Sequence, residues 1–436
     1  MRTLFSGLFS LMLMINIFPQ QTGNHILSTE EMQSDFLEMR KILEEEHGSL
    51  YEYTSKSIFD SLFAVQYSKI KGEMHMNEFF ALLAPITAKT GCGHTSVWMP
   101  GSYWTEGENN MFPLIFNWIG DKVVVTGSYN NEPQIPPGTV IHTLNGREMN
   151  DILMDIYETA PSDALIEYGR RSAAARRFPM YYTRLYGFPS EWRISYTLPG
   201  NKKPDTVNLL PATNAAARAV VFKNFNNPEL SLKRDPGKKI AILTIDSFIY
   251  YDRQEYFRNF LDSCFSEINN SGIDKLIIDL RNNDGGDPYA AAALLSHIEP
   301  SPLPYYAEPY NHYEVLADPV APAKNRFTGK LAVLISGRCF STNGHFCALL
   351  KYHKIGTIIG SPSGATYKCN GGRDGVRTLE NSKIMLYFTR SSYAVAVSGM
   401  DKRKPIMPDI PVEETPEDIA AGRDPVLESA ISFLRR

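Results

Sequence analysis

The sequence predicts a layered α/β protein that begins with a helical region and a small β-rich region. Three observations support this fold class. Helical periodicity runs through about residues 27–89 of a region that extends to residue 99, short β-like runs with a helical insertion fill residues 105–215, and strand and helix patterns alternate through residues 238–436. Such alternation is typical of helices packed on a mainly parallel sheet. With 436 residues and 43% hydrophobic composition, the chain is long enough for roughly two or three hydrophobic cores.

The helical region opens with a capping-box pattern. Ser28 is followed three residues later by Glu31, and apolar residues then recur every three or four positions up to about residue 47. This pattern predicts an amphipathic helix with a defined start. Two further helical patterns follow, at residues 57–70 and 76–90.

The β-rich region contains one informative order of elements, at residues 136–156. A Gly turn leads into an apolar strand, an Asn-Gly turn and then an amphipathic helix. This order resembles half of a PDZ-like peptide-binding fold, and it fits any small β domain equally well. Residues 160–190 predict helix, and Pro199-Gly200 predicts the turn of a hairpin.

The third region alternates strands and helices. Residues 274–281, DKLIIDLR, are apolar on both faces, as expected for a strand that helices cover on both sides. Gly272 closes the helix before this strand. The other segments with a clear pattern are strands at 239–249, 330–336 and 355–360 and helices at 287–298 and 341–354.

The composition argues against several classes of partner and cofactor. A net charge of −4 and a pI near 6.2 give no positive field for a phosphate backbone, so nucleic acid is not an expected partner. The cysteines are too few and too scattered for a disulfide scaffold or a zinc site, and at least one thiol stays unpaired. We expect no metal and no organic cofactor. The five cysteines are Cys92, Cys264, Cys339, Cys347 and Cys369.

The first residues have the order of a secretory signal peptide. Arg2 precedes an apolar run from Leu4 to Phe18, and Pro19 and polar residues follow. The run is short for a membrane span, and no later segment is apolar enough to cross a bilayer. An uncleaved anchor is the alternative. We expect removal of residues 1–22 and a secreted or periplasmic mature protein without stable membrane insertion.

Two adjacent glycines mark a candidate anion-binding turn. In IIDLRNNDGGDPYAAAALL a buried strand runs into a polar turn and then a helix, which exposes the backbone N–H groups of Gly285 and Gly286 at the helix start. Such donors suit an anion or an oxyanion. A tight turn that needs positive φ explains the same glycines without any ligand.

A second strand, turn and helix contain Ser341. In LAVLISGRCFSTNGHF this serine falls at the helix N-terminus, where capping of the helix is the simplest role for its hydroxyl. The Gly285-Gly286 turn favours a catalytic role for Ser341 over simple helix capping. Two such turns side by side place a hydroxyl and amide donors around one carbonyl group, which is an arrangement suited to nucleophilic catalysis.

These stretches together resemble the C-terminal processing, or tail-specific, serine peptidase family. The matching pieces are DLRNNDGG, Ser341 at a helix start, TIIGSPSGA and PDIPV, in the family's order. The resemblance implies a crotonase-like layered α/β catalytic domain at residues 238–436 and hydrolysis of peptides or unfolded proteins. It also implies Ser341 as nucleophile and an oxyanion hole from the N–H of Thr342 with that of Gly285 or Gly286.

The sequence departs from the Ser-Lys branch of that family. Thr366 stands where the branch has its Lys base, and Gly344 stands where it has a Glu. The tricorn-core and interphotoreceptor retinoid-binding branch instead takes a His from a Gly-His-Ser/Thr segment. The segment GCGHTSVW is similar to it and supplies His94.

Three bases therefore compete for Ser341. The resemblance favours His94, since the ordinary pKa of an imidazole lies near neutral pH. The alternatives are His345, one helical turn along but directed back along its own helix, and Lys368, two residues past the family's Lys position. Asp401 is the candidate acid that orients His94, while Asp409 is expected to be structural.

The function that follows is a secreted or periplasmic serine endopeptidase. The alternative is a non-catalytic protein on the same fold that binds a peptide or an apolar ligand. Ser341 together with His94 discriminates the two, because a binding protein needs neither. A lipase or esterase of the α/β-hydrolase type is disfavoured, because no Gly-x-Ser-x-Gly motif occurs.

Overall fold

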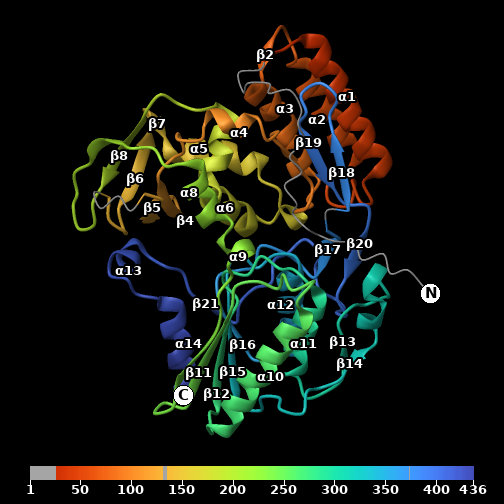
Figure 1. Ribbon diagram of the computed structural model, residues 1–436, viewed down its shortest axis with the longest axis vertical. Coiled ribbons are helices and arrows are strands. Elements are labelled where there is room, and N and C mark those ends of the chain that lie inside the picture. Colours follow the sequence, from red (N-terminus) through yellow and green to blue (C-terminus); the bar gives the residue numbers. More distant parts are fainter. Residues whose placement is uncertain (1–25, 131–134, 373) are drawn as a thin grey trace.

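The computed structural model describes residues 26–130, 135–372 and 374–436, so the predicted signal peptide lies outside the described residues. Three parts are visible in Figure 1: helices α1 to α3 with a small sheet, a β-rich part beside them, and an α/β part below both. The mixed α/β fold class predicted from the sequence is confirmed. No described helix is long and apolar enough to cross a membrane.

The α/β part is built on a six-stranded sheet. Its order is β10-β11-β12-β15-β16-β21, with β10 antiparallel to β11 and all other neighbours parallel. The parallel strands end at one edge, where β12 and β15 run into the two turns singled out in the sequence. The strands are β10 (Leu230–Asp235), β11 (Ile240–Ile245), β12 (Lys275–Asp279), β15 (Lys330–Ile335), β16 (Thr357–Gly360) and β21 (Ile410–Pro411).

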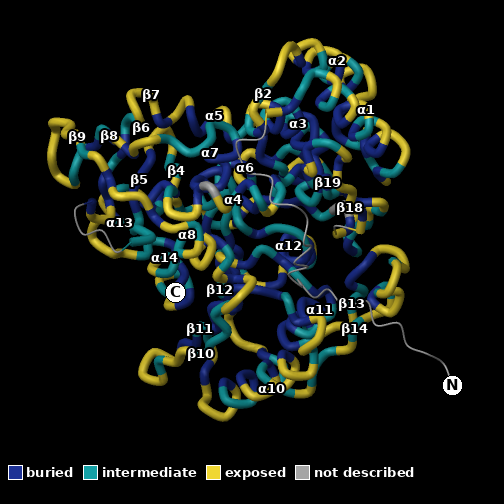
Figure 2. Tube along the Cα trace, turned by 45° about the horizontal axis from the view of Figure 1, so that its top comes forward, coloured by how far each residue is buried: buried dark blue, intermediate teal, exposed yellow. Residues whose placement is uncertain are grey.

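Helices cover both faces of this sheet. Leu276 and Ile278 of β12 point into the core under α10, α11 and α12, whereas Ile277 points into the core under α14. This confirms the prediction of a strand that is apolar on both faces. Figure 2 shows α12 as a largely buried helix. The four helices are α10 (Gln254–Asn270), α11 (Pro288–Ser296), α12 (Thr342–His353) and α14 (Pro425–Arg435).

The helical part is joined to the C-terminal half of the chain. The predicted capping box at Ser28 and Glu31 is present. The buried carboxylate of Asp35 accepts hydrogen bonds from Asn381 and Ser382, and β3 pairs with β19. Segments about 290 residues apart therefore form one unit. The elements are α1 (Thr29–Glu46), α2 (Lys56–Ser68), α3 (Met76–Lys89), β3 (Ser96–Trp98), β18 (Gly375–Thr378) and β19 (Met385–Phe388).

The β-rich part has an antiparallel sheet of order β4-β5-β6-β8-β9 with three helices. The predicted Asn-Gly turn is present, with positive φ at Asn145 and Gly146, and the predicted hairpin joins β8 to β9. The elements are β4 (Leu114–Ile119), β5 (Lys122–Ser128), β6 (Val140–Leu144), β8 (Trp192–Thr197), β9 (Asp205–Leu209), α5 (Met149–Thr159), α6 (Glu167–Arg176) and α7 (Phe178–Tyr186).

Short elements complete the described chain. They are β1 (Ile26–Leu27), β2 (Met74–His75), α4 (Tyr103–Glu106), β7 (Arg147–Glu148), η1 (Asp163–Leu165), α8 (Asn214–Val221), α9 (Lys223–Asn226), β13 (Leu303–Pro304), η2 (Asn311–Ala317), β14 (Pro319–Val320), β17 (Lys368–Asn370), β20 (Ser392–Ala394) and α13 (Pro416–Ala420).

Candidate active site

Ser341 occupies a strained junction between β15 and α12. Its φ of 54° and ψ of −130° lie in a region that residues with a side chain rarely adopt. Ordinary helix-capping serines have extended backbone and accept a bond from the first turn, as Ser28 does. The Ser341 side chain makes no capping bond. Helix capping therefore does not explain why a serine stands at position 341. Backbone strain of this kind is concentrated at functional sites.

The glycine turn lies directly against Ser341. A Cβ added to Gly285 would sit 2.9 Å from the Cβ of Ser341 and 3.0 Å from the backbone nitrogen of Thr342. The Thr342 hydroxyl donates a 2.6 Å hydrogen bond to the carbonyl oxygen of Gly286. The structure thus brings together the two strand-to-helix turns that the sequence singled out.

The backbone N–H groups near Ser341 are not equally available. The N–H of Gly285 donates a 2.8 Å bond to Oδ1 of Asn283, so this group is already used. The prediction of Gly285 as an oxyanion donor is therefore not supported. The N–H groups of Gly286 and Thr342 remain as candidate donors beside Ser341.

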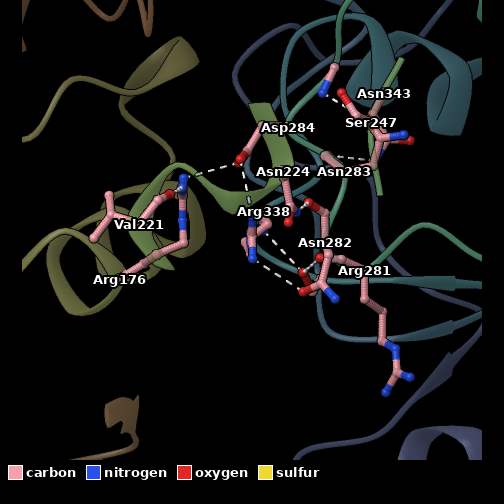
Figure 3. A network of polar contacts seen from close by, with 12 residues as sticks. Arg176, Val221, Asn224, Ser247, Arg281, Asn282, Asn283, Asp284, Arg338 and Asn343 are labelled. Atoms are coloured by element: carbon pink, nitrogen blue, oxygen red, sulfur yellow. Dashed lines mark hydrogen bonds and ion pairs between the residues drawn. The ribbon is translucent and has the colours of Figure 1, made fainter. Parts of the chain in front are cut away.

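Two buried asparagines hold the turn in place. Asn283 donates from Nδ2 to the carbonyl of Ile245 at 3.0 Å, and Asn343 of α12 donates to the carbonyls of Asn283 and Leu280 at 2.9 and 3.2 Å. Figure 3 shows Asn283 and Asn343 close together. Because both side chains are fully buried, these bonds fix the turn relative to α12 at low local dielectric.

Two guanidinium groups flank Asp284, the residue before the Gly285-Gly286 pair. Figure 3 shows Asp284 between Arg176 and Arg338, with ion-pair distances of 3.0 and 3.1 Å. Burial alone would raise the pKa of Asp284, but the two guanidinium groups outweigh it and lower that pKa. Burial lowers the pKa of Arg176 to about 9, still well above neutral pH. The environment next to the glycine turn is therefore positively charged.

His94 lies beside the residue that precedes Ser341. Its ring centroid is 4.7 Å from that of Phe340. A Cβ added to Gly93 would come within 2.3 Å of the same phenyl ring, so only glycine allows this approach. The structure thus places the GCGHTSVW segment next to the Ser341 turn, although more than 240 residues separate them.

A buried carboxylate that the sequence reasoning missed holds the His94 turn. Asp163 is 1% exposed, and its Oδ1 accepts a 2.9 Å hydrogen bond from the N–H of Gly93. Next to it, the N–H of Ala164 donates to the carbonyl of Gly91 at 2.8 Å. No motif surrounds Asp163 in the sequence, so only the contact itself reveals it.

His345 was predicted as an alternative base, and its position contradicts that role. The side chain is fully buried, and its ring lies 5.0 Å edge-on from the ring of Tyr393. Neither ring nitrogen hydrogen-bonds to a group in the described part of the chain, Ser341 included. Burial lowers the pKa of His345 to about 3. This histidine is a neutral core residue.

Lys368, the other alternative base, is engaged as a cation. Its Nζ lies 2.9 Å from Oε1 of Glu52, and Lys402 contacts the same oxygen. Hydrogen bonds from Lys368 and Lys402 lower the pKa of Glu52. The carboxylate therefore stays charged and binds both ammonium groups. The Lys368 ammonium group is thus bound to Glu52 and is not directed at Ser341.

Asp401, predicted to orient His94, forms hydrogen bonds within its own loop. Its side chain is exposed, and its carboxylate accepts a 2.9 Å bond from the N–H of Arg403. The carbonyl of Asp401 accepts from the N–H of Lys404. Asp401 therefore stabilises its own loop, as Asp side chains commonly do in turns. Asp409 has the structural role that was predicted, because it contacts Lys351 and accepts from the N–H of Ile358.

The two departures from the Ser-Lys branch also have a structural reason. A Cβ on Gly344 would lie 2.5 Å from the Cβ of Ala365, so no Glu fits there. Thr366 is fully buried and its hydroxyl donates to the carbonyl of Lys368 at 2.9 Å. In the described residues, no cluster of His, Cys, Asp and Glu is suited to a metal ion.

Replacing Gly286 with Ala is expected to destabilise the protein by about 2–4 kcal/mol. The new Cβ would lie 2.3 Å from the backbone carbon of Phe248, at a φ of +143° that disfavours any side chain. Urea unfolding of the purified protein measures the loss. Gly272→Ala is the control, since its φ of +63° carries strain but nothing lies within 4 Å of its new Cβ. An equal loss in both variants would contradict a steric role for Gly286.

The comparisons with known proteins agree with this geometry. Residues 239–412 match the model of peptidase family S41. The chain is 24% identical over 256 residues to the tricorn protease homolog of Saccharolobus solfataricus, which covers 54% of this chain and 20% of that protein. The chain thus spans about a fifth of that relative's length.

Solved structures extend the likeness to nearly the whole described fold. Mature CPAF superimposes with a TM-score of 0.67 at 14% identity, covering 93% of this chain and 97% of that chain. Mature CPAF complexed with lactacystin gives a TM-score of 0.65 at 14% identity, covering 93% and 98%. At this identity the structural likeness concerns the fold, and the family follows from the sequence match. Through residues 239–412, this chain belongs to peptidase family S41, a family of serine peptidases.

Proposed function

We propose that this chain hydrolyses peptide bonds with Ser341 as nucleophile and His94 as general base. The observation that supports this most is the strained backbone of Ser341, with φ 54° and no capping bond, directly against the glycine turn. A serine at a sharp strand-to-helix turn presents its hydroxyl at the edge of the sheet, as in other serine hydrolases. A substrate carbonyl then has access to both the hydroxyl and the neighbouring amide groups.

In the proposed mechanism the Ser341 oxygen attacks the peptide carbonyl while His94 accepts the hydroxyl proton. The N–H groups of Gly286 and Thr342 stabilise the oxyanion that forms. His94 returns the proton to the leaving amine, and water then hydrolyses the acyl-enzyme by the same route. The N-terminus of α12 and the guanidinium groups around Asp284 favour negative charge at this place.

Asp163 is proposed as a positioning residue for His94. Its hydrogen bond to Gly93 and the neighbouring bond to Gly91 fix the turn that carries the imidazole. Since Asp163 reaches His94 through the backbone, its role is to set distance and direction. A misplacement of about 1 Å in such a base costs about 100-fold in rate.

Replacing Asp163 with Ala is expected to lower kcat about 10- to 100-fold with little change in KM. Asp163→Asn is expected to retain most of the activity, because its side-chain oxygen still accepts the bond from Gly93. Asp401→Ala is the comparison and is expected to stay within about twofold of the wild type, because Asp401 serves its own loop. Steady-state kinetics on an unfolded protein substrate measures all three. A large loss in Asp401→Ala with normal Asp163→Ala would return the orienting role to Asp401.

The β-rich part fits the role of a substrate-docking module. We propose that the sheet from β4 to β9 acts as a PDZ-like domain and that residues 238–436 form a crotonase-like catalytic domain. The antiparallel sheet with α5 packed on it agrees with such a module. A strand-shaped peptide can bind at the edge of such a sheet by backbone hydrogen bonds.

We also propose that the protein is exported. The support is the order of Arg2, the apolar run from Leu4 to Phe18 and the polar exit. N-terminal sequencing of protein from its native host is expected to begin between about Gln20 and Ser28. Intact Met1 on membrane-bound protein would instead favour the uncleaved anchor.

A further inference from the structure

A small cavity lies between α3, α7, β3 and the C-terminal end of α5. Its volume is about 20 Å³, which is enough for one water-sized particle, since a bound water needs about 10–15 Å³ measured in this way. Arg177, Arg184, Ser96, Thr87 and Thr159 are among the residues that line it. The helices α3, α5 and α7 pack against one another in the upper half of the view in Figure 2. The cavity is separate from the glycine turn.

Two guanidinium groups face this cavity without a carboxylate partner. Arg184 is 7% exposed, and its Nε has no hydrogen-bond partner in the described part of the chain. The Nε of Arg177 is likewise buried and without such a partner. None of the ion pairs between described residues involves either arginine. Arg177 also repels Arg184 and thereby helps to lower its pKa, although burial is the larger cause.

Asp284, the carboxylate that acts electrostatically on Arg177, is already bonded to two other arginines. Asp284 interacts electrostatically with Arg177, but its two oxygens are bonded to Arg176 and Arg338. Three guanidinium groups, those of Arg176, Arg338 and Arg177, thus interact with one carboxylate. Leaving several buried charges of one sign together is costly, so an additional anion would stabilise this region.

The rest of the cavity wall also suits an anion. The guanidinium of Arg184 lies 5.0, 5.3 and 5.7 Å from the ring centroids of Trp98, Trp104 and Tyr181, which keeps it charged and oriented. Ser96 Oγ accepts a 2.9 Å bond from the indole N–H of Trp98, so the hydroxyl proton of Ser96 is left to donate. The wall therefore presents the Ser96 hydroxyl and positive charge, whereas Thr87 and Thr159 donate their hydroxyl protons to the carbonyls of Ala84 and Ile156.

We propose that this cavity binds one small monovalent inorganic anion, of the size of chloride, between Arg177 and Arg184. The volume of about 20 Å³ fits a single-atom anion. A bound anion would join α7 to β3, where Ser96 follows His94 by two residues. The proposal does not depend on peptidase activity, because binding is measured directly.

The first test compares the thermal unfolding of the full chain in sodium chloride and in sodium gluconate at equal ionic strength. Chloride is expected to raise the Tm by about 2–4 °C, because a ligand that binds only the folded state stabilises it. Arg184→Gln is expected to lose this difference. Arg218→Gln is expected to keep it, because Arg218 lies on the exposed side of α8 and repels Arg184 without lining the cavity. Equal Tm values for the wild type in both salts, or equal loss in both variants, would overturn the proposal.

The second test needs only the wild type and so holds even if Arg184→Gln fails to fold. Crystals grown with sodium bromide are expected to show an anomalous peak inside the cavity, within hydrogen-bond distance of the Arg184 guanidinium. Bromide is slightly larger than chloride but takes the same donors. Anomalous peaks confined to the protein surface would mean adventitious ions only and would overturn the proposal.

Discussion

Ser341→Ala is expected to abolish labelling by a fluorophosphonate probe and to lower peptide hydrolysis by at least about 10⁴-fold. The physical reason is that the serine oxygen forms the covalent bond to the substrate, so no other group replaces it. Mass spectrometry of the labelled wild type is expected to locate the probe on Ser341. Circular dichroism checks that the variant is folded.

Two other serines near the site serve as controls. Ser336 donates its hydroxyl to the carbonyl of Arg281 at 2.5 Å, and Ser363 donates to the carbonyl of Ala365 at 2.7 Å. Their hydroxyls are therefore already engaged, and Ser336→Ala and Ser363→Ala are expected to stay reactive. Labelling that survives in Ser341→Ala would refute the assignment of the nucleophile.

His94→Ala is expected to lower peptide hydrolysis by about 10⁴-fold or more, because nucleophile and base act as a unit. Lys368→Ala is expected to have a mild effect, since its ammonium group is bound to Glu52. His345→Leu is expected to be mild as well, since the buried imidazole makes no hydrogen bond to Ser341 in the described structure. Steady-state kinetics of the three variants distinguishes the bases.

The pH profile provides an independent check of this assignment. An imidazole accepts a proton only when it is neutral, so activity with His94 as base is expected to rise through roughly pH 6 to 7. A lysine base would give a more alkaline rise. Loss of activity in Lys368→Ala with normal His94→Ala would return the protein to the Ser-Lys branch. A wild type that cleaves no unfolded protein or peptide library would favour the binding protein instead.

Local sequence patterns were sufficient for much of the fold. The capping box at Ser28, the Asn145-Gly146 turn and the doubly buried strand β12 follow from short-range preferences and hydrophobic period, and all are present. Two elements were not predicted, although α14 has a local start signal in its N-cap Asp424 and Pro425. The antiparallel edge strand β10 and the C-terminal helix α14 depend on pairing and packing with distant parts of the sheet.

The sequence by itself indicated the two strand-to-helix turns, at Gly285-Gly286 and at Ser341. The tertiary structure decided that they meet, because β12 and β15 are parallel neighbours and end at the same edge of the sheet. The tertiary structure also decided which of the candidate oxyanion donors and candidate bases are available for catalysis. The bond from Gly285 to Asn283 uses one amide, the Glu52 carboxylate engages Lys368, and burial isolates His345. Asp163 approaches Gly93 across 70 residues. Such long-range hydrogen bonds and burial depend on how separate elements pack, which local preferences do not specify.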